Sequence, residues 1–165
     1  MIPRVHELIT TLDLSPHPEG GYYRETYKSD LFFDADKEAP SFPGRRSCGA
    51  AIYFLLEGKD VSRLHRIKAD ELWHFYEGSP LTVHVIHPDG TLEDICLGPD
   101  TARGETFQAL VTAGCWFGAS LAKGGHALVG CTTHPGFEFQ DFEMGEREEL
   151  LKQWPQHEAL IKKLT

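Results

Sequence analysis

The chain has 165 residues, of which 25 are acidic and 16 basic, so its formal net charge is −9. This length favours one domain with a sizeable core, and the acidic excess argues against nucleic-acid binding through a general basic surface. The N-terminus lacks the apolar core of a signal peptide, and no later run approaches membrane-spanning length. The four cysteines are widely spaced and form no CxxC pair. We therefore expect a cytoplasmic protein without a membrane or nucleic-acid partner.

The first predicted element is a short N-terminal helix within residues 1–14, because Val5, Leu8 and Leu12 recur at helical spacing. The following segment, His17 to Gly21 (HPEGG), contains proline and two glycines, and we interpret it as a turn that places the first strand. Residues 22–27 (YYRETY) then have the composition of a strand.

Short strands dominate the middle of the chain. Residues 47–56 form a nearly continuous apolar run, and residues 81–87 and 91–97 flank the turn signal Asp89-Gly90. Further strand patterns cover residues 107–111, 115–121 and 127–133, whereas residues 30–46 show no sustained period and are interpreted as a surface loop. This pattern predicts an all-β sandwich or barrel over residues 22–143.

The C-terminal segment has a different pattern. Apolar residues recur at helical spacing on both sides of Pro155, which predicts two short helices within residues 146–165. No linker or low-complexity segment interrupts the chain, so we expect a single domain over residues 1–165.

The stretch from Gly58 to Gly78 concentrates the residues with the most chemistry. His65 and Glu71 lie six residues apart, at the end of one predicted strand and the start of the next. Strand alternation places Glu71, Trp73 and Phe75 on one face, with His74 on the other. A buried polar pair is costly unless it is satisfied or serves a function. We therefore take His65 and Glu71 as the candidate catalytic pair, with a purely structural hydrogen-bonded pair as the alternative.

Seven further residues are candidate ligand contacts, because aromatic rings stack on planar ligands and guanidinium groups match phosphates. The alternatives are core packing for the aromatic residues and simple solvation for the arginine. The candidates are Tyr22, Arg24, Tyr53, Trp73, His74, Phe75 and Trp116. Arg46 and Arg63 are, like Arg24, candidate phosphate contacts, with simple solvation as the alternative.

The central stretch resembles the first motif of the cupin superfamily, with Gly58, His65, Glu71 and Gly78 in their places and Ile67 where a second histidine is usual. Residues 112–117 resemble the second motif, with Phe117 in place of its final histidine. Five blocks in order are similar to the cupin-5 family (DUF985): HPEGGYYRETY, IYFLL, HRIKADELWHFYEG, AGCWFGA and HPGFEFQDFE. The resemblance implies a jelly-roll fold, like that of the RmlC-type sugar epimerases, and a homodimer.

Three functions remain open at this point. The first is binding of a small molecule in the barrel, with a nucleotide or nucleotide sugar implied by the resemblance; it includes epimerase or isomerase chemistry with His65 as a base tuned by Glu71 and no cofactor. The second is a metal-dependent dioxygenase or isomerase, in which a divalent transition metal binds His65, Glu71 and a third ligand such as His74 or His84. The third is a non-catalytic binding or storage-like protein.

Overall fold

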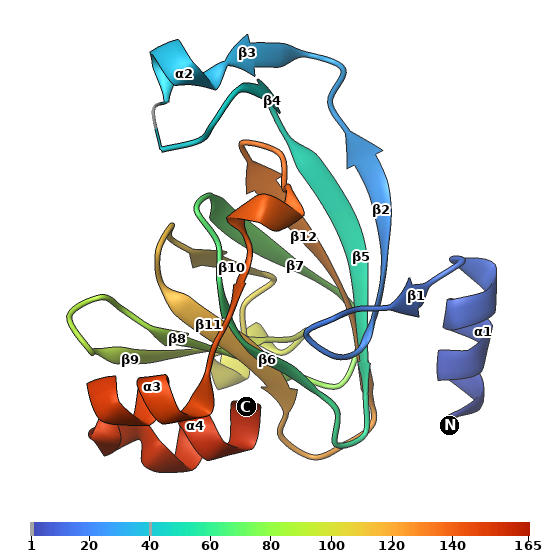
Figure 1. Cartoon of the computed structure of the whole chain (residues 1–165). Helices are drawn as coiled ribbons and strands as arrows, with labels where there is room; N and C mark the ends of the chain where they lie inside the picture. Colours follow the sequence, from blue (N-terminus) through green and yellow to red (C-terminus); the bar gives the residue numbers. More distant parts are fainter. Residues whose placement is uncertain (1, 40) are drawn as a thin grey trace.

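The computed structural model describes residues 2–39 and 41–165 and consists mainly of two facing β-sheets (Figure 1). The first sheet has six strands in the order β1-β2-β5-β12-β7-β10, and the second has five in the order β13-β6-β11-β8-β9. Neighbouring strands pair antiparallel in both sheets. The predicted all-β cupin architecture is thereby confirmed.

The strands of the first sheet are β1 (Ser15–Pro16), β2 (Tyr22–Lys28), β5 (Ala50–Glu57), β12 (His126–His134), β7 (Asp70–Gly78) and β10 (Gln108–Val111). Those of the second sheet are β13 (Glu143–Met144), β6 (Val61–Arg66), β11 (Trp116–Leu121), β8 (Leu81–Ile86) and β9 (Leu92–Leu97). A small separate sheet pairs β3 (Phe32–Asp34) with β4 (Arg45–Ser47).

The main core lies between the two large sheets, because alternate side chains of each strand point inward. On β7, Glu71 and Trp73 are buried, whereas His74 is half-buried and Tyr76 is exposed. The predicted alternation along this strand is confirmed.

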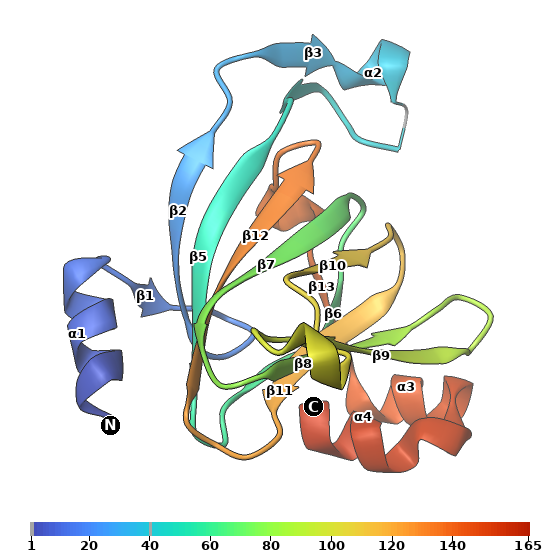
Figure 2. The same cartoon turned by 180° about the vertical axis from the view of Figure 1, so that it is seen from behind.

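Helices cover the outer faces of the sheets, as the views from two sides show (Figures 1 and 2). Helix α1 (Pro3–Thr11) packs Val5 and Leu8 against Leu55 and Leu128 of the first sheet. Helices α3 (Arg147–Gln153) and α4 (Glu158–Leu164) cover the second sheet over Leu64, Ile86 and Trp116. The expected helices at both ends of the chain are present. Met1, included in the predicted first helix, lies outside the described residues.

The prediction of a surface loop over residues 30–46 is wrong in part, because the segment contains regular secondary structure although most of its described residues are exposed. This segment contains β3, helix α2 (Ala35–Glu38) and the start of β4. Arg46 forms an ion pair with Asp141, and both residues are buried. These two charged residues can be buried because they satisfy each other across 95 residues of sequence.

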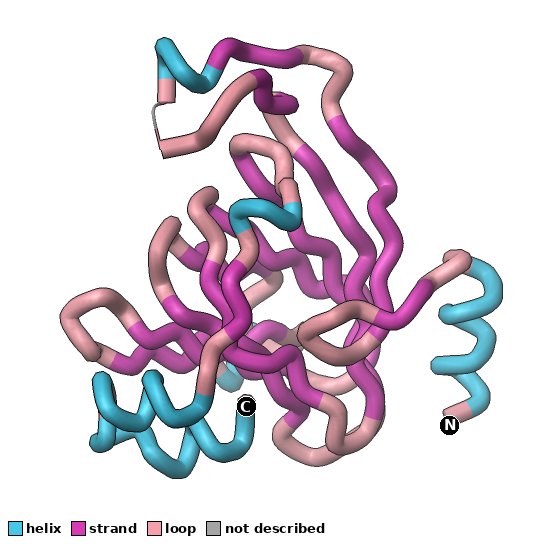
Figure 3. The backbone as a smooth tube through the Cα atoms, viewed as in Figure 1, coloured by secondary structure: helices cyan, strands magenta, loops and turns pink. Residues whose placement is uncertain are grey.

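Short 3-10 turns complete the chain, at Thr101–Arg103, Phe139–Asp141 and Pro155–His157. The helices are short and lie around the β-sheets (Figure 3). Within residues 2–39 and 41–165, none of them has the length and apolar character needed to cross a bilayer.

Candidate functional site

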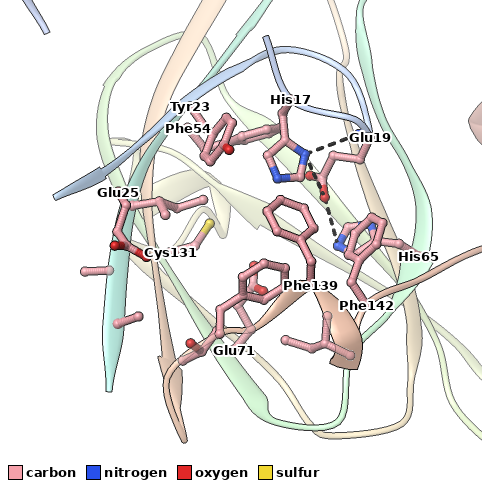
Figure 4. Close-up of a pocket in the computed structure, with 16 residues that line it drawn as sticks. His17, Glu19, Tyr23, Glu25, Phe54, His65, Glu71, Cys131, Phe139 and Phe142 are labelled. Carbon is pink, nitrogen blue, oxygen red and sulfur yellow. Dashed lines mark hydrogen bonds and ion pairs between the residues drawn. The ribbon is translucent and has the colours of Figure 1, made fainter. Parts of the chain in front are cut away.

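A cavity of about 280 Å³ opens into the space between the two sheets (Figure 4). Its wall combines a largely apolar surface with a few acidic and imidazole groups. The lining residues are His17, Glu19, Tyr23, Glu25, Ala50, Ala51, Ile52, Phe54, His65, Ile67, Glu71, Cys131, Thr133, Phe137, Phe139 and Phe142. An apolar pocket with a few convergent polar groups is the usual form of a small-molecule site.

The loop between β1 and β2 carries Glu19 into this cavity. The loop is closed by hydrogen bonds from the His17 N–H to the Gly21 carbonyl and from the Gly20 N–H to the His17 carbonyl, each 3.0 Å long. Its backbone also joins β6, because the Arg63 N–H donates to the Glu19 carbonyl at 2.8 Å. The loop therefore holds the Glu19 side chain against the second sheet.

Gly20 makes this close approach feasible, and replacing it with alanine should disrupt the site. Its φ is +111°, and a Cβ atom there would overlap the Val61 carbonyl oxygen. We expect Gly20→Ala to lower the free energy of unfolding by roughly 2–5 kcal/mol, since strain and overlap add. The measurement is urea denaturation. Gly104→Ala is the matched control, because Gly104 has φ +82° but open space around it. It should cost about 1 kcal/mol, and equal losses in the two variants would show that the close approach is unimportant.

Glu19 and His65 form a buried polar contact between the loop and β6. The Nδ1 atom of His65 lies 2.7 Å from the Arg63 carbonyl, which only accepts, so Nδ1 carries a hydrogen. The other ring nitrogen, Nε2, lies 3.2 Å from Oε2 of Glu19. These two atoms can form a hydrogen bond only when either Nε2 or Oε2 carries a proton. The Ser62 hydroxyl donates to the other Glu19 oxygen at 2.6 Å and fixes the carboxyl group.

Burial decides where that proton resides. It lowers the pKa of His65 to about 4, although the hydrogen bond to Arg63 opposes this. Burial also raises the pKa of Glu19, opposed by His17, Ser62 and Arg63. Both shifts favour a neutral carboxylic acid beside a neutral imidazole.

Glu71 is the second acid of the cavity. Burial, followed by the nearby Glu19 charge, raises the pKa of Glu71 to about 8. A hydrogen bond with the Cys131 thiol acts in the opposite direction. Glu71 therefore gains and loses a proton close to neutral pH, which suits a general acid or base.

Both predicted catalytic residues, His65 and Glu71, line the cavity, but they do not form the expected pair. The carboxyl group in contact with His65 is that of Glu19, whose Oε2 lies 3.2 Å from the His65 Nε2. His65 lies on β6 in the second sheet and Glu71 on β7 in the first, so the short connection between them crosses from one sheet to the other. This crossing separates the two side chains and leaves room for Glu19.

The seven predicted ligand contacts do not line the cavity. Tyr22 and Tyr53 pack at the outer face of the first sheet, beside the α1 cluster, and the Arg24 guanidinium lies over the Tyr53 ring at 5.9 Å. His74, on the same sheet, hydrogen bonds to Thr132 at 3.0 Å.

The remaining three aromatic candidates pack in the cores. Trp73 and Phe75 point inward but belong to the main core, where Trp73 contacts Phe54 and Phe117. Trp116 lies under the C-terminal helices, since strand alternation turns it away from Phe117. The prediction that these aromatic residues line the ligand cavity is therefore corrected.

Several lining residues escaped the sequence analysis, above all Glu19 and the phenylalanines Phe137, Phe139 and Phe142. The acidic residue inside the HPEGG turn was the available signal for Glu19. A carboxyl group flanked by proline and two glycines has no helical or strand role of its own. The phenylalanines come from the segment after β12, where the ring centroids of Phe137 and Phe142 lie 6.2 Å apart.

The residues do not fit a metal centre built on His65 and Glu71. Both ring nitrogens of His65 are engaged by Arg63 and Glu19. Ile67 lines the cavity, and the Phe117 ring contacts the His65 ring with centroids 4.1 Å apart. Apolar side chains therefore occupy the two positions at which the cupin motifs usually have histidines.

The proposed third ligands are also unsuitable. His84 is hydrogen bonded to Asp94 at 2.6 Å and Ser120 at 3.0 Å, and His74 is bonded to Thr132 on the outer face. Among residues 2–39 and 41–165, no three His, Cys, Asp or Glu side chains gather closely enough to hold a metal ion.

Comparison with known proteins supplies the family context. The family model described as the cupin superfamily (DUF985) matches residues 6–145. Protein SO0799 from Shewanella oneidensis is 45% identical, with a TM-score of 0.87 over 96% of this chain and 95% of that one. A hypothetical protein from Leishmania major is 36% identical, with the same TM-score of 0.87 and 97% of both chains covered.

More distant matches extend the comparison. The uncharacterized yeast protein YML079W is 25% identical over 90% of this chain and 78% of its own length. Oxalate decarboxylase from Bacillus subtilis shares only the fold, with 16% identity and a TM-score of 0.57 over 93% of this chain and 37% of that one.

Proposed function

Because this chain belongs to the DUF985 family of the cupin superfamily, we propose that its barrel cavity binds a small molecule and transfers protons on it without a metal. The chemistry that fits is an isomerisation or epimerisation next to a carbonyl group. The observation that carries this proposal is the contact of Glu19 with His65, at 3.2 Å between Oε2 and Nε2, in a cavity that also contains Glu71.

The two acids have different environments and hence different roles. The Glu19–His65 pair holds one proton that it can donate to a carbonyl oxygen of the substrate. Glu71, with a pKa of about 8, accepts a proton from the neighbouring carbon when it is ionised. Carboxyl groups whose environments differ in this way commonly divide acid and base roles between them.

The lining argues against the nucleotide or nucleotide sugar that the resemblance suggested. Among the described residues around the cavity, none is a lysine or arginine, whereas three are glutamates. A phosphate there would meet carboxyl groups without a charged partner. The volume of about 280 Å³ also lies at the lower end of ligand pockets, which span roughly 300–1,000 Å³. A small substrate without phosphate fits better.

A thermal-shift screen in the presence of a chelator tests the binding. The panel contains small ketones, hydroxy acids and free sugars, with nucleotides and nucleotide sugars for comparison. A ligand at 100-fold its dissociation constant stabilises the fold by about 2.7 kcal/mol, which corresponds to a rise in Tm of roughly 5–10 °C. We expect such a shift from a phosphate-free compound. A shift that occurs only with nucleotides or only with added metal would contradict the proposal.

Hydrogen–deuterium exchange at carbon tests the proton transfer. The bound carbonyl compound is incubated in D₂O and its exchange followed by NMR. We expect Glu71→Gln and His65→Gln to slow the exchange at least about 100-fold. His87→Gln is the matched control, because His87 lies outside the cavity and pairs with Glu93 at 2.9 Å. Binding without enzyme-dependent exchange would instead support the non-catalytic binding protein. The homodimer and the cytoplasmic location stay predictions from the sequence.

A further inference from the structure

The cavity wall contains carboxyl and imidazole groups but no lysine or arginine among its described residues. Glu19, Glu25 and Glu71 line it, and its two histidines, His17 and His65, both have pKa values lowered by burial. Burial therefore keeps both imidazoles neutral at neutral pH. Any charge that these side chains carry near neutral pH is therefore negative.

Aromatic rings enclose the same space. Phe139 lies 5.0 Å from Phe137 and 6.1 Å from Phe142, measured between ring centroids, and both pairs are edge-to-face. The His17 ring contacts Tyr23 at 4.4 Å on the neighbouring wall. Figure 4 shows His17, Phe139 and Phe142 gathered between Glu19 and Glu71. The negative faces of such rings attract organic cations.

Two hydrogen-bond acceptors lie side by side in the wall. Thr133 and Glu71 are directly opposite each other on β12 and β7. The Thr133 residue is only 5% exposed, and its hydroxyl oxygen is buried without a hydrogen-bond partner among the described residues. A buried hydroxyl group without a partner costs free energy, so a ligand group that bonds to it is strongly favoured.

We propose that the cavity takes an organic ammonium ion with at least one N–H bond, carried on a small apolar body. The ammonium group lies among the phenylalanines and donates to Glu71 and Thr133. This inference rests on the proposed small-molecule function and narrows its substrate class to carbonyl compounds that also carry an amine.

Proton release is coupled to this binding. Glu71 holds a proton in the empty cavity at neutral pH, since its pKa is about 8. A cation beside it favours the carboxylate and displaces that proton to solvent. The ligand thereby generates the ionised Glu71 that the proposed proton transfer requires.

Three probes of similar shape but different charge test the inference: cyclohexylamine, cyclohexanol and cyclohexanecarboxylate. Binding is measured by calorimetry at pH 7 in buffers with different ionisation enthalpies. We expect the amine to bind about ten-fold more tightly than the alcohol, with the carboxylate weakest. Amine binding should also release a proton, whereas alcohol binding should not.

Two variants locate the effect. Glu71→Gln should abolish most of the proton release. It should also lower the affinity for the amine about ten-fold, while the affinity for the alcohol is retained. Glu149→Gln removes the same charge from an exposed position on α3 and should change neither. Circular dichroism of both variants checks that they are folded.

The outcomes separate this inference from the proposed function. If the alcohol binds as tightly as the amine, the cavity binds small molecules but the cation inference is wrong. Tightest binding of the carboxylate would overturn it as well. If none of the three probes binds, the inference fails, while the proposed function is judged independently by the carbonyl screen and its isotope exchange.

Discussion

Replacing Arg46 with methionine is expected to lower the free energy of unfolding by about 3–5 kcal/mol. Arg46 is 1% exposed, and its two terminal nitrogens donate to the two oxygens of Asp141 at 2.7 and 2.9 Å. Removing the guanidinium group leaves the Asp141 carboxylate buried without its counter-charge, so most of the loss is the cost of an unpaired charge. Urea denaturation at neutral pH measures it.

The Arg46 variant should also weaken ligand binding. Asp141 is the last residue of the turn Phe139–Asp141 and is followed directly by Phe142. Phe139 and Phe142 both line the cavity. The ion pair therefore fixes the aromatic wall to β4. A variant that binds ligand as well as the parent protein would show that this wall does not depend on the pair.

A matched control and a double variant isolate the buried pair. Arg103→Met breaks the exposed pair with Asp100, in which the arginine side chain is 81% exposed, and should cost no more than about 1 kcal/mol. Adding Asp141→Leu to Arg46→Met removes the unpaired charge and should restore a large part of the stability. A double variant that loses the sum of both single losses would contradict this explanation.

Replacing Glu71 with glutamine is expected to stabilise the protein, and increasingly so as the pH rises. The Glu71 carboxyl group has an ordinary pKa of 4.5 in the unfolded chain and about 8 in the folded protein. Below pH 4.5 both states hold the proton, so the substitution changes little there. Between pH 4.5 and 8 the unfolded chain loses the proton first, and the stability of the parent protein falls.

The expected size follows from the same pKa values. The rise of the Glu71 pKa from 4.5 to about 8 lowers the free energy of unfolding of the parent protein by at most about 5 kcal/mol at pH 9. Each factor of ten in the ionisation constant corresponds to about 1.36 kcal/mol. Urea denaturation at pH 5, 7 and 9 measures the difference between variant and parent. Because Glu19 also has a raised pKa, part of the decline toward high pH should remain in the variant.

The surface variant Glu149→Gln serves as the control and should show a difference that is nearly constant with pH. In the acid range the histidines act in the opposite direction. His65, with a pKa of about 4 in the folded state, disfavours folding as the pH falls below 6.5 in parent and variant alike. A Glu71→Gln advantage that grows toward acid pH would show that the carboxyl group is ionised in the folded protein.

The sequence by itself determined the strands and the inward face of β7. Apolar runs, alternation and the Asp89-Gly90 turn are local signals, because backbone geometry fixes the side-chain period within each strand. They correctly placed Glu71 inside the barrel, and the motif resemblance correctly selected His65 as its companion in the cavity.

Only the tertiary structure decided which groups meet. Alternation separates Tyr22 from Tyr23 but leaves open which of the two faces the cavity, since that depends on the layer packed against each side of the sheet. The partner of His65 comes from a turn far along the chain, and Arg46 finds Asp141 across 95 residues. These long-range contacts determine burial, and burial raises the pKa of Glu71 and lowers that of His65. The chemistry of the site therefore depends on how distant segments pack, which no local pattern in the sequence specifies.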